Sequence, residues 1–219
     1  YGWYGKHAAD HVMTEADWSD EEALIKADNW YCVSKTRAER LAWEMSKEAG
    51  SKFKLAVMNP CLILGPMLQP ELNTSSKAVL TYLTGQRAEV QNCTKCIVDV
   101  RDVAEAHVCA VALHEDDADA GVWGHRHLLV GGCPPWAQIA ATLREWAPTE
   151  EIKSRVPATV EVAVGKPGLG ANPPHATPFN VHRAECVLGL GRHKGVEEMV
   201  RATAESLQKW GLIPEESKM

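Results

Sequence analysis

Patterns typical of nucleic-acid and membrane partners are missing from this 219-residue sequence. No run of lysines and arginines occurs, and the formal net charge is −6. The positive surface that nucleic acids and anionic membranes attract is therefore missing. No apolar run approaches the roughly 20 residues of a membrane-spanning helix. We expect neither a nucleic acid nor a membrane as a partner.

A complete dinucleotide-binding fingerprint is also missing. Such a site is marked by G-x-G-x-x-G between a first strand and helix, with an acidic residue about 20 positions later. Here "GKPGLG" (165–170) and "GLGRHKG" (189–195) have the wrong spacing and do not open a strand-helix unit. We predict that these glycines form turns and helix stops.

The seven cysteines are too scattered to suit a disulfide framework. Their number is odd and several lie in apolar segments, which favours reduced, buried thiols and a cytoplasmic location. Cys93 and Cys96 have metal-ligand spacing, but no second ligand pair lies nearby, so we expect no metal site. The sequence starts with Tyr1 rather than methionine, so the lack of a signal peptide carries little weight.

Helical periods alternate with short apolar runs, which favours an α/β sheet. Residues 1–28 have no period and are expected to be irregular, and the proline-rich segment after residue 60 is expected to be a loop. Helices are predicted at 29–49, 74–83, 101–114, 134–146 and 196–210, and strands at 54–59, 96–100, 127–130 and 160–164. In the first helix, Ala38, Leu41, Ala42, Met45 and Ala49 form the predicted apolar side.

Tyr31 and Lys35 stand four positions apart near the start of the first predicted helix. This spacing places both side chains on one face, with Cβ atoms roughly 5–6 Å apart. An ammonium group about 5 Å from a phenol favours the phenolate by roughly 3 kcal/mol at an effective dielectric constant near 20. Such a phenol suits carbonyl reduction, in which it protonates the oxygen while a nicotinamide supplies hydride. Tyr-x-x-x-Lys also arises by chance, so an incidental pair stays open.

The context of this pair resembles a known family. "NWYCVSK" and "AERLAWEMSKEAG" are similar to the active-site helix of extended short-chain dehydrogenases/reductases, specifically the cinnamoyl-CoA reductase and dihydroflavonol reductase group. The likeness continues in order through "NPCLILGPMLQPELNTS", "YLTG", "VDVRDVAEAHV" and "RHLL". It implies the C-terminal part of an NAD(P)-binding Rossmann-like doubly wound fold with a smaller substrate-binding lobe.

The resemblance also implies roles for individual residues. Tyr31 would be the proton donor, and Lys35 would bind the nicotinamide ribose and favour proton release from Tyr31. Arg126 matches an arginine found near the substrate. The nicotinamide end of NADP(H) would contact Pro60, Cys61, Leu62, Ile63 and Ser75, largely through backbone atoms.

The resemblance divides the chain into two regions. Residues 1–130 would hold the C-terminal half of the Rossmann-like domain with the active-site helix at 29–49, and the substrate lobe would begin near residue 66. Residues 131–219 would be mainly substrate lobe and C-terminal helix. The family's glycine fingerprint, first strands and an active-site serine precede the tyrosine helix, so we expect a reductase without its N-terminal segment. We expect the isolated chain to expose apolar surface and to be inactive.

Three functional hypotheses follow. The first is an NADP(H)-dependent reductase acting on a carbonyl or acyl-CoA group of a phenylpropanoid- or flavonoid-like small molecule. Members that act on CoA thioesters have H-x-x-K where this chain has Ala78 and Thr81, so a ketone or aldehyde substrate stays open. The second is a truncated, non-catalytic module that only binds or assembles with a partner. The third is a globular domain in which the Tyr31 and Lys35 pair is incidental. The oligomeric state is not indicated.

Overall fold

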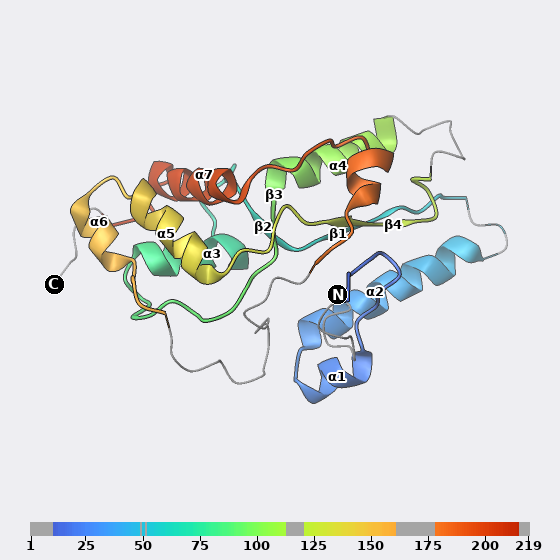
Figure 1. Ribbon diagram of the computed structural model, residues 1–219. Helices are drawn as coiled ribbons and strands as arrows, with labels where there is room; N and C mark the ends of the chain where they lie inside the picture. The colour runs from blue at the N-terminus through green and yellow to red at the C-terminus, as the bar shows by residue number, and fades with distance from the viewer. Residues whose placement is uncertain (1–10, 49, 51, 113–120, 161–177, 215–219) are drawn as a thin grey trace.

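Two short parallel strand pairs form the centre of the protein. The computed structural model describes residues 11–48, 50, 52–112, 121–160 and 178–214. Strand β1 (Val57–Pro60) pairs with β4 (Arg126–Leu129), and β2 (Leu62–Leu64) pairs with β3 (Ile97–Asp99). Because β2 follows β1 after a single residue, the two pairs run on into one another through the middle of Figure 1.

Helices surround these strands. Figure 1 shows α2 and α4 on opposite sides of the β1 and β4 pair, while α3, α5, α6 and α7 gather beyond the other pair. The helices are α1 (Glu21–Lys26), α2 (Trp30–Lys47), α3 (Thr74–Leu83), α4 (Val100–Ala112), α5 (Trp136–Trp146), α6 (Glu150–Arg155) and α7 (Val196–Lys209), with a π-helical turn, η2, at Arg183–Val187. None of the helices in the described ranges is long and apolar enough to cross a membrane.

The apolar side chains form two clusters. One joins α3, α5, α6 and α7 and includes the fully buried Leu83, Ile139, Leu143 and Leu207. The other lies around the strands and α4. Truncation of a fully buried leucine to alanine typically costs about 2–5 kcal/mol of stability, so these clusters dominate the packing energy.

Most predicted elements are confirmed to within a few residues. The helices predicted at 29–49, 74–83, 101–114, 134–146 and 196–210 are α2, α3, α4, α5 and α7, and the strands predicted at 54–59, 96–100 and 127–130 are β1, β3 and β4. Gly189 and Gly191 have positive φ angles, as expected of turn glycines. The glycines at 165–170 lie outside the described residues, as does the strand predicted at 160–164 beyond Val160, which forms an isolated bridge with Val90.

Two predictions of irregular structure are wrong. Within residues 1–28, α1 begins after Asp20, whose side chain accepts a hydrogen bond from the Ala23 N–H, and Glu21 and Glu22 fall in its first turn. Both features stabilise a helix N-terminus. The expected loop after residue 60 contains β2, because its backbone pairs with β3. That pairing joins segments more than 30 residues apart, which a local pattern does not reveal.

The packed face of α2 also differs from the predicted one. Val33 and Thr36 are buried, whereas the side chains of Leu41 and Met45 are 55% and 47% exposed. The apolar surface expected on the isolated chain is thus present along this helix. Glu39 on α2 instead accepts hydrogen bonds from Asn59 of β1 and Arg126 of β4.

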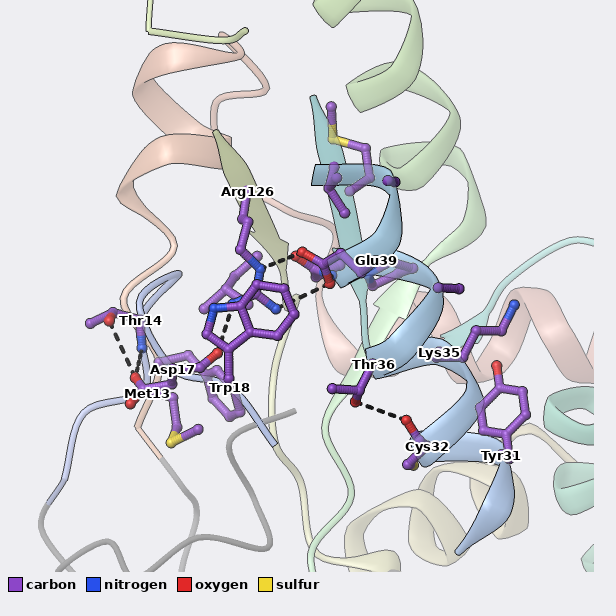
Figure 2. Close-up of a pocket in the computed structure, with 18 residues that line it drawn as sticks. Met13, Thr14, Asp17, Trp18, Tyr31, Cys32, Lys35, Thr36, Glu39 and Arg126 are labelled. Atoms are coloured by element: carbon purple, nitrogen blue, oxygen red, sulfur yellow. Dashed lines mark hydrogen bonds and ion pairs between the residues drawn. The ribbon is translucent and has the colours of Figure 1, made fainter. Parts of the chain in front are cut away.

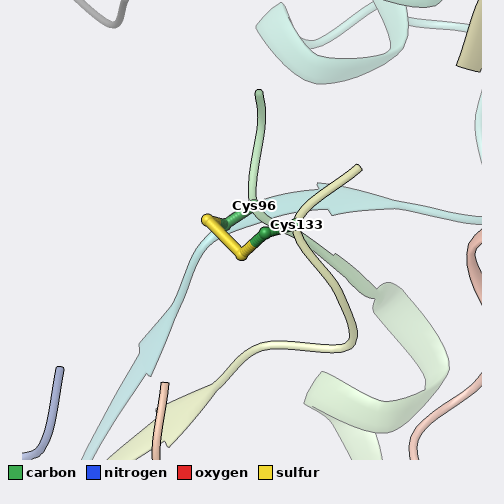
Figure 3. Close-up of a disulfide and its surroundings, with 2 residues drawn as sticks. All are labelled: Cys96 and Cys133. Carbon is green, nitrogen blue, oxygen red and sulfur yellow. A yellow bond between two sulfur atoms is a disulfide. The ribbon is translucent and has the colours of Figure 1, made fainter. Parts of the chain in front are cut away.

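One pair of cysteines is oxidised, contrary to the prediction of reduced thiols. Cys96 and Cys133 form a disulfide (Figure 3). The backbones of their segments pair antiparallel, since the Ile97 N–H donates to the Gly132 carbonyl and the Lys95 N–H to the Pro134 carbonyl. These bonds place Cys96 opposite Cys133. The prediction failed because the sequence separation of 37 residues gives no local signal of this pairing.

Reduction of this disulfide should destabilise the fold. A cross-link over this sequence separation typically contributes roughly 2–4 kcal/mol, mainly by restricting the unfolded chain. We expect dithiothreitol to lower the melting temperature of the wild-type chain and of Cys186→Ser, which lacks only an exposed free thiol. Cys133→Ala should melt at the reduced temperature with or without reductant. Wild-type melting curves that are identical in both conditions would exclude a stabilising disulfide.

Buried His127 should make stability depend on pH. Its Nε2 lies 3.0 Å from the Val122 carbonyl oxygen, and Nδ1 is buried without a hydrogen-bond partner in the described part of the chain. Burial lowers the pKa of His127 below the usual value of about 6.5. The unfolded chain therefore binds the proton more readily, and stability falls as the pH drops through about 6.5 toward the folded-state pKa.

Replacement of His127 should remove that component of the pH dependence. We expect His127→Phe to unfold with a smaller loss of stability between pH 7 and 5 than the wild type, as measured by urea denaturation at each pH. The matched control is His182→Gln, because His182 is exposed and is not among the groups that shift the pKa of His127, so it should leave the wild-type slope unchanged. Equal slopes for His127→Phe and the wild type would contradict the assignment.

Candidate active site

Local capping fixes where the helix of Tyr31 and Lys35 begins. The Asn29 side chain accepts a hydrogen bond from the Cys32 N–H at 3.3 Å. Asp28 has a positive φ of 53°, which turns the chain between α1 and α2. Because α2 starts at Trp30, Tyr31 lies in its first turn and Lys35 one turn further along.

The structure brings Tyr31 and Lys35 together. The Lys35 ammonium lies 5.7 Å from the centre of the Tyr31 ring, and Figure 2 shows the two side chains side by side on one flank of α2. Tyr31 is 68% exposed, so its hydroxyl is open to a ligand that approaches this flank. The geometry fits the predicted pair, although their predicted chemical roles stay predictions.

Both residues line a pocket of about 470 Å³ between α2 and the β1 and β4 strands. Pro60, at the end of β1, is also part of its wall. The lining is mostly apolar, as in typical small-molecule sites. It consists of Met13, Thr14, Asp17, Trp18, Tyr31, Cys32, Lys35, Thr36, Ala38, Glu39, Ala42, Val57, Met58, Asn59, Pro60, Arg126, Leu128 and Phe179.

The charged groups of the pocket are unevenly paired. Partial burial opposes ionisation of Asp17, but hydrogen bonds from the Thr14 N–H and from His11 hold the pKa of Asp17 below its usual value. Glu39 is paired with Arg126. Lys35 makes no ion pair with a carboxylate among the described residues. Among the described residues, Lys35 is therefore the cation of this pocket that lacks a carboxylate partner, and it lies beside the Tyr31 phenol.

The other residues predicted to meet the cofactor lie outside the pocket lining. The Cys61 N–H donates to the Leu129 carbonyl and the Leu62 N–H to the Cys96 carbonyl, so both donors serve the sheet. Ile63 lies in β2 and Ser75 in the first turn of α3. Burial raises the pKa of the Cys61 thiol, which keeps it neutral. Contacts of these residues with a cofactor stay predictions.

Arg126 lines the pocket, but its guanidinium is engaged with protein groups. Nε and Nη2 donate to the two carboxylate oxygens of Glu39 at 2.6 and 3.3 Å. Nη1 donates to the backbone carbonyls of Glu15 and Asp17 at 2.8 and 2.7 Å, and the guanidinium lies 4.0 Å from the ring centre of Trp18. These contacts account for four of its five N–H groups. A contact of Arg126 with substrate stays a prediction, and it would have to use the one remaining N–H group.

Comparison with known proteins identifies the family. The family model described as "NAD dependent epimerase/dehydratase family" matches residues 2–124, which is more than half of the chain. This chain belongs to that family. Within it, the chain is similar to plant cinnamoyl-CoA reductases, as the sequence motifs predicted.

Two relatives show the extent of the similarity. Cinnamoyl-CoA reductase 1 of Petunia hybrida is 44% identical over 204 residues, which cover 93% of this chain and 55% of the relative. Cinnamoyl-CoA reductase 2 of Arabidopsis thaliana is 45% identical over 204 residues, with the same coverage. The chain thus spans about half the length of these two relatives.

Solved structures confirm the α/β Rossmann-like reductase fold. The yeast methylglyoxal/isovaleraldehyde reductase complexed with NADPH has a TM-score of 0.70 and 26% identity, and the match covers 91% of this chain and 58% of that one. Vestitone reductase from alfalfa has a TM-score of 0.69 and 23% identity, with coverage of 93% and 60%. The predicted fold class and the predicted relation to nicotinamide-dependent reductases are therefore confirmed.

Sequence reasoning missed Glu39 and Trp18, two residues that line the pocket. Glu39 follows Lys35 by four residues and Tyr31 by eight, so the helical period alone places it on the same stripe. Its partner Arg126 is 87 residues away in sequence, which hides the pairing. In the described part of the chain, no group of three or more His, Cys, Asp or Glu side chains is arranged to hold a metal ion.

Proposed function

We propose that this chain carries the proton-transfer part of an NADP(H)-dependent reductase. The substrate would be a carbonyl or acyl-CoA group of a phenylpropanoid- or flavonoid-like compound. The observation that carries the proposal is the shared pocket: Tyr31 and Lys35 lie together beside the end of β1, and Lys35 has no carboxylate partner in the described residues. The names of the plant relatives and the NADPH complex of the yeast reductase support it.

The residues present fit one end of the cofactor. A free ammonium is a suitable donor to ribose hydroxyls, and an apolar wall ending at Pro60 suits a flat nicotinamide ring. NADPH, when bound, supplies hydride to the carbonyl carbon. Lys35 would hold the ribose, and Cys61, Leu62, Ile63 and Ser75 remain proposed contacts of the nicotinamide end. Ligands in open α/β sheets lie beyond the carboxyl ends of strands, where Pro60 lies.

The Tyr31 phenol would give its proton to the oxygen of the reduced group. Tyr31 is largely exposed and lines the pocket, and the neighbouring ammonium of Lys35 would stabilise the phenolate that proton transfer leaves behind. Arg126 remains a proposed substrate contact. It would contact substrate through the one N–H group that does not bond to a protein acceptor among the described residues. The proposed reaction involves no covalent nucleophile.

The organisation of the chain is part of the proposal. Residues 1–130 would form the Rossmann-like part, with the substrate lobe beginning near residue 66 and continuing through 131–219. The apolar cluster shared by α3, α5, α6 and α7 supports this division, because it joins elements on both sides of residue 131. We propose a cytoplasmic protein with a small-molecule substrate and without nucleic-acid or membrane partners.

The competing proposal is a non-catalytic module that binds or assembles with a partner. The observation that favours it is the exposed apolar surface of α2, where Trp30, Leu41 and Met45 are 58%, 55% and 47% exposed. This surface and a reductase site are compatible in a longer chain. A turnover experiment distinguishes the two proposals: the 219-residue chain either turns over substrate by itself or does so only when further sequence is added.

Cofactor binding tests the Lys35 assignment. We expect NADPH to bind, with quenched tryptophan fluorescence, to a chimera in which the N-terminal part of the Petunia relative precedes this chain. Lys35→Met should weaken binding at least about tenfold, because an ammonium hydrogen bond contributes roughly 1.5–3 kcal/mol. Lys47→Met, on the same helix and also exposed, is the matched control and should bind as the wild type does. Equal affinities of the two variants would refute the Lys35 role.

Turnover tests the Tyr31 assignment. Tyr31→Phe in the same chimera should lower kcat by about 10²–10⁴-fold, the usual contribution of a general acid, while NADPH still binds. The measurement is NADPH oxidation with cinnamoyl-CoA and with an aromatic aldehyde. Retained turnover would refute the proton-donor role. Turnover by the 219-residue chain alone would refute the non-catalytic module.

A further inference from the structure

Both oxygens of the Glu39 carboxylate are fully used by protein donors. Oε1 accepts from Arg126 Nε at 2.6 Å and from Trp43 Nε1 at 3.2 Å. Oε2 accepts from Asn59 Nδ2 at 3.1 Å and from Arg126 Nη2 at 3.3 Å. The Glu39 and Arg126 side chains are only 11% and 10% exposed. With four donors, the carboxylate has little hydrogen-bonding capacity left for a ligand.

This single carboxylate joins three elements of the site. Glu39 belongs to α2 and Arg126 to β4 (Figure 2). Asn59 belongs to β1. Asn59 directly precedes Pro60, the pocket residue at the end of β1. Val57 and Arg126 are register partners in the parallel pair, and Asn59 lies two residues after Val57, on the same face of β1. Asn59 and Arg126 therefore reach α2 from the same face of the sheet. The contact therefore links the helix to the strand end beside the pocket.

The apolar contacts of α2 are too few to hold the helix in place without the Glu39 contact. Among the apolar side chains of α2 only Val33 is buried, and Leu41 and Met45 are about half exposed. Lys35 lies one turn before Glu39, about 6 Å along the axis and 40° around it, and Tyr31 lies one turn further. Any rotation or sliding of α2 that shifts Glu39 shifts the other two side chains with it.

We infer that Glu39 is a positioning residue, which sets the rotation and height of α2 over the end of β1 and thereby places Tyr31 and Lys35. This inference rests on the proposed function for its catalytic consequence. Arg126 is the required partner, since its contacts with the carbonyls of Glu15 and Asp17 anchor the guanidinium on the other side. A displacement of about 1 Å in such a site can cost about a hundredfold in rate.

The first test reads the position of Tyr31 without cofactor or turnover. The 219-residue chain contains four tyrosines, so it can be labelled with fluorotyrosine and its Tyr31 fluorine resonance assigned with Tyr31→Phe. Glu39→Gln replaces one acceptor oxygen by a donor amide, and we expect it to shift or broaden the Tyr31 resonance. Glu44→Gln, an exposed carboxylate on the same helix, is the matched control and should leave it unchanged. A Tyr31 resonance unaffected by Glu39→Gln would overturn the inference.

The second test separates positioning from stability. Glu39→Met leaves Arg126 buried without its carboxylate and should lower the melting temperature. Adding Arg126→Met removes that unpaired charge, and an apolar pair often restores stability. If Glu39 positions the site, the double variant recovers in melting temperature while the Tyr31 resonance stays displaced. A resonance that returns to its wild-type position with the melting temperature would assign Glu39 a purely structural role.

The kinetic arm uses whichever chain turns over substrate in the experiments above. We expect Glu39→Gln to lower kcat about 10–100-fold, with a smaller change in the KM for NADPH, and Glu44→Gln to change neither. A displaced Tyr31 resonance without turnover in any wild-type form would keep the positioning role and refute the reductase proposal. Wild-type kcat in Glu39→Gln would refute the positioning role and leave the reductase proposal standing.

Discussion

The Arg126 guanidinium is the group on which the arrangement of α2, the strands and the pocket depends. A buried cation needs hydrogen-bonded partners, and here they come from α2 and from the carbonyls of Glu15 and Asp17. Its face also packs on Trp18. Because Arg126 starts β4 and faces Val57 in β1, the strand register and the helix placement are parts of one arrangement. Loss of the charge pair would remove the contact that joins α2 to β4.

That polar anchor explains an unusual feature of the helix. An amphipathic helix normally orients itself by an apolar stripe, yet the stripe around Leu41 and Met45 faces outward. The Glu39 carboxylate overrides it, because moving Glu39 away would leave Arg126 buried without a counter-charge. The exposed stripe is then open to a further part of a longer chain or to a partner. In either case α2 presents Tyr31 and Lys35 from an orientation that Glu39 determines.

The sequence predicted what depends on local signals and missed what depends on distant ones. The Asn29 cap, the four-residue spacing of Tyr31 and Lys35, and the apolar run of β1 all act within a few residues, and the structure places them as expected. The contact of Glu39 with Arg126 and the disulfide of Cys96 with Cys133 join residues 87 and 37 positions apart. In both pairs, the sequence around one residue does not indicate its partner. The β2 strand was missed for the same reason.

The charge distribution in the pocket connects this scaffold to chemistry. Asp17 and Glu39 are the two carboxylates in the wall, and both accept hydrogen bonds from other protein groups, Asp17 from Thr14 and Glu39 from Arg126. Neither neutralises Lys35, whose ammonium lies beside the Tyr31 ring instead. If Arg126 did not occupy Glu39, that carboxylate would stand one turn from Lys35 and compete for its charge. The pair that holds the helix in place therefore also keeps Lys35 available to a ligand and to the phenolate of Tyr31.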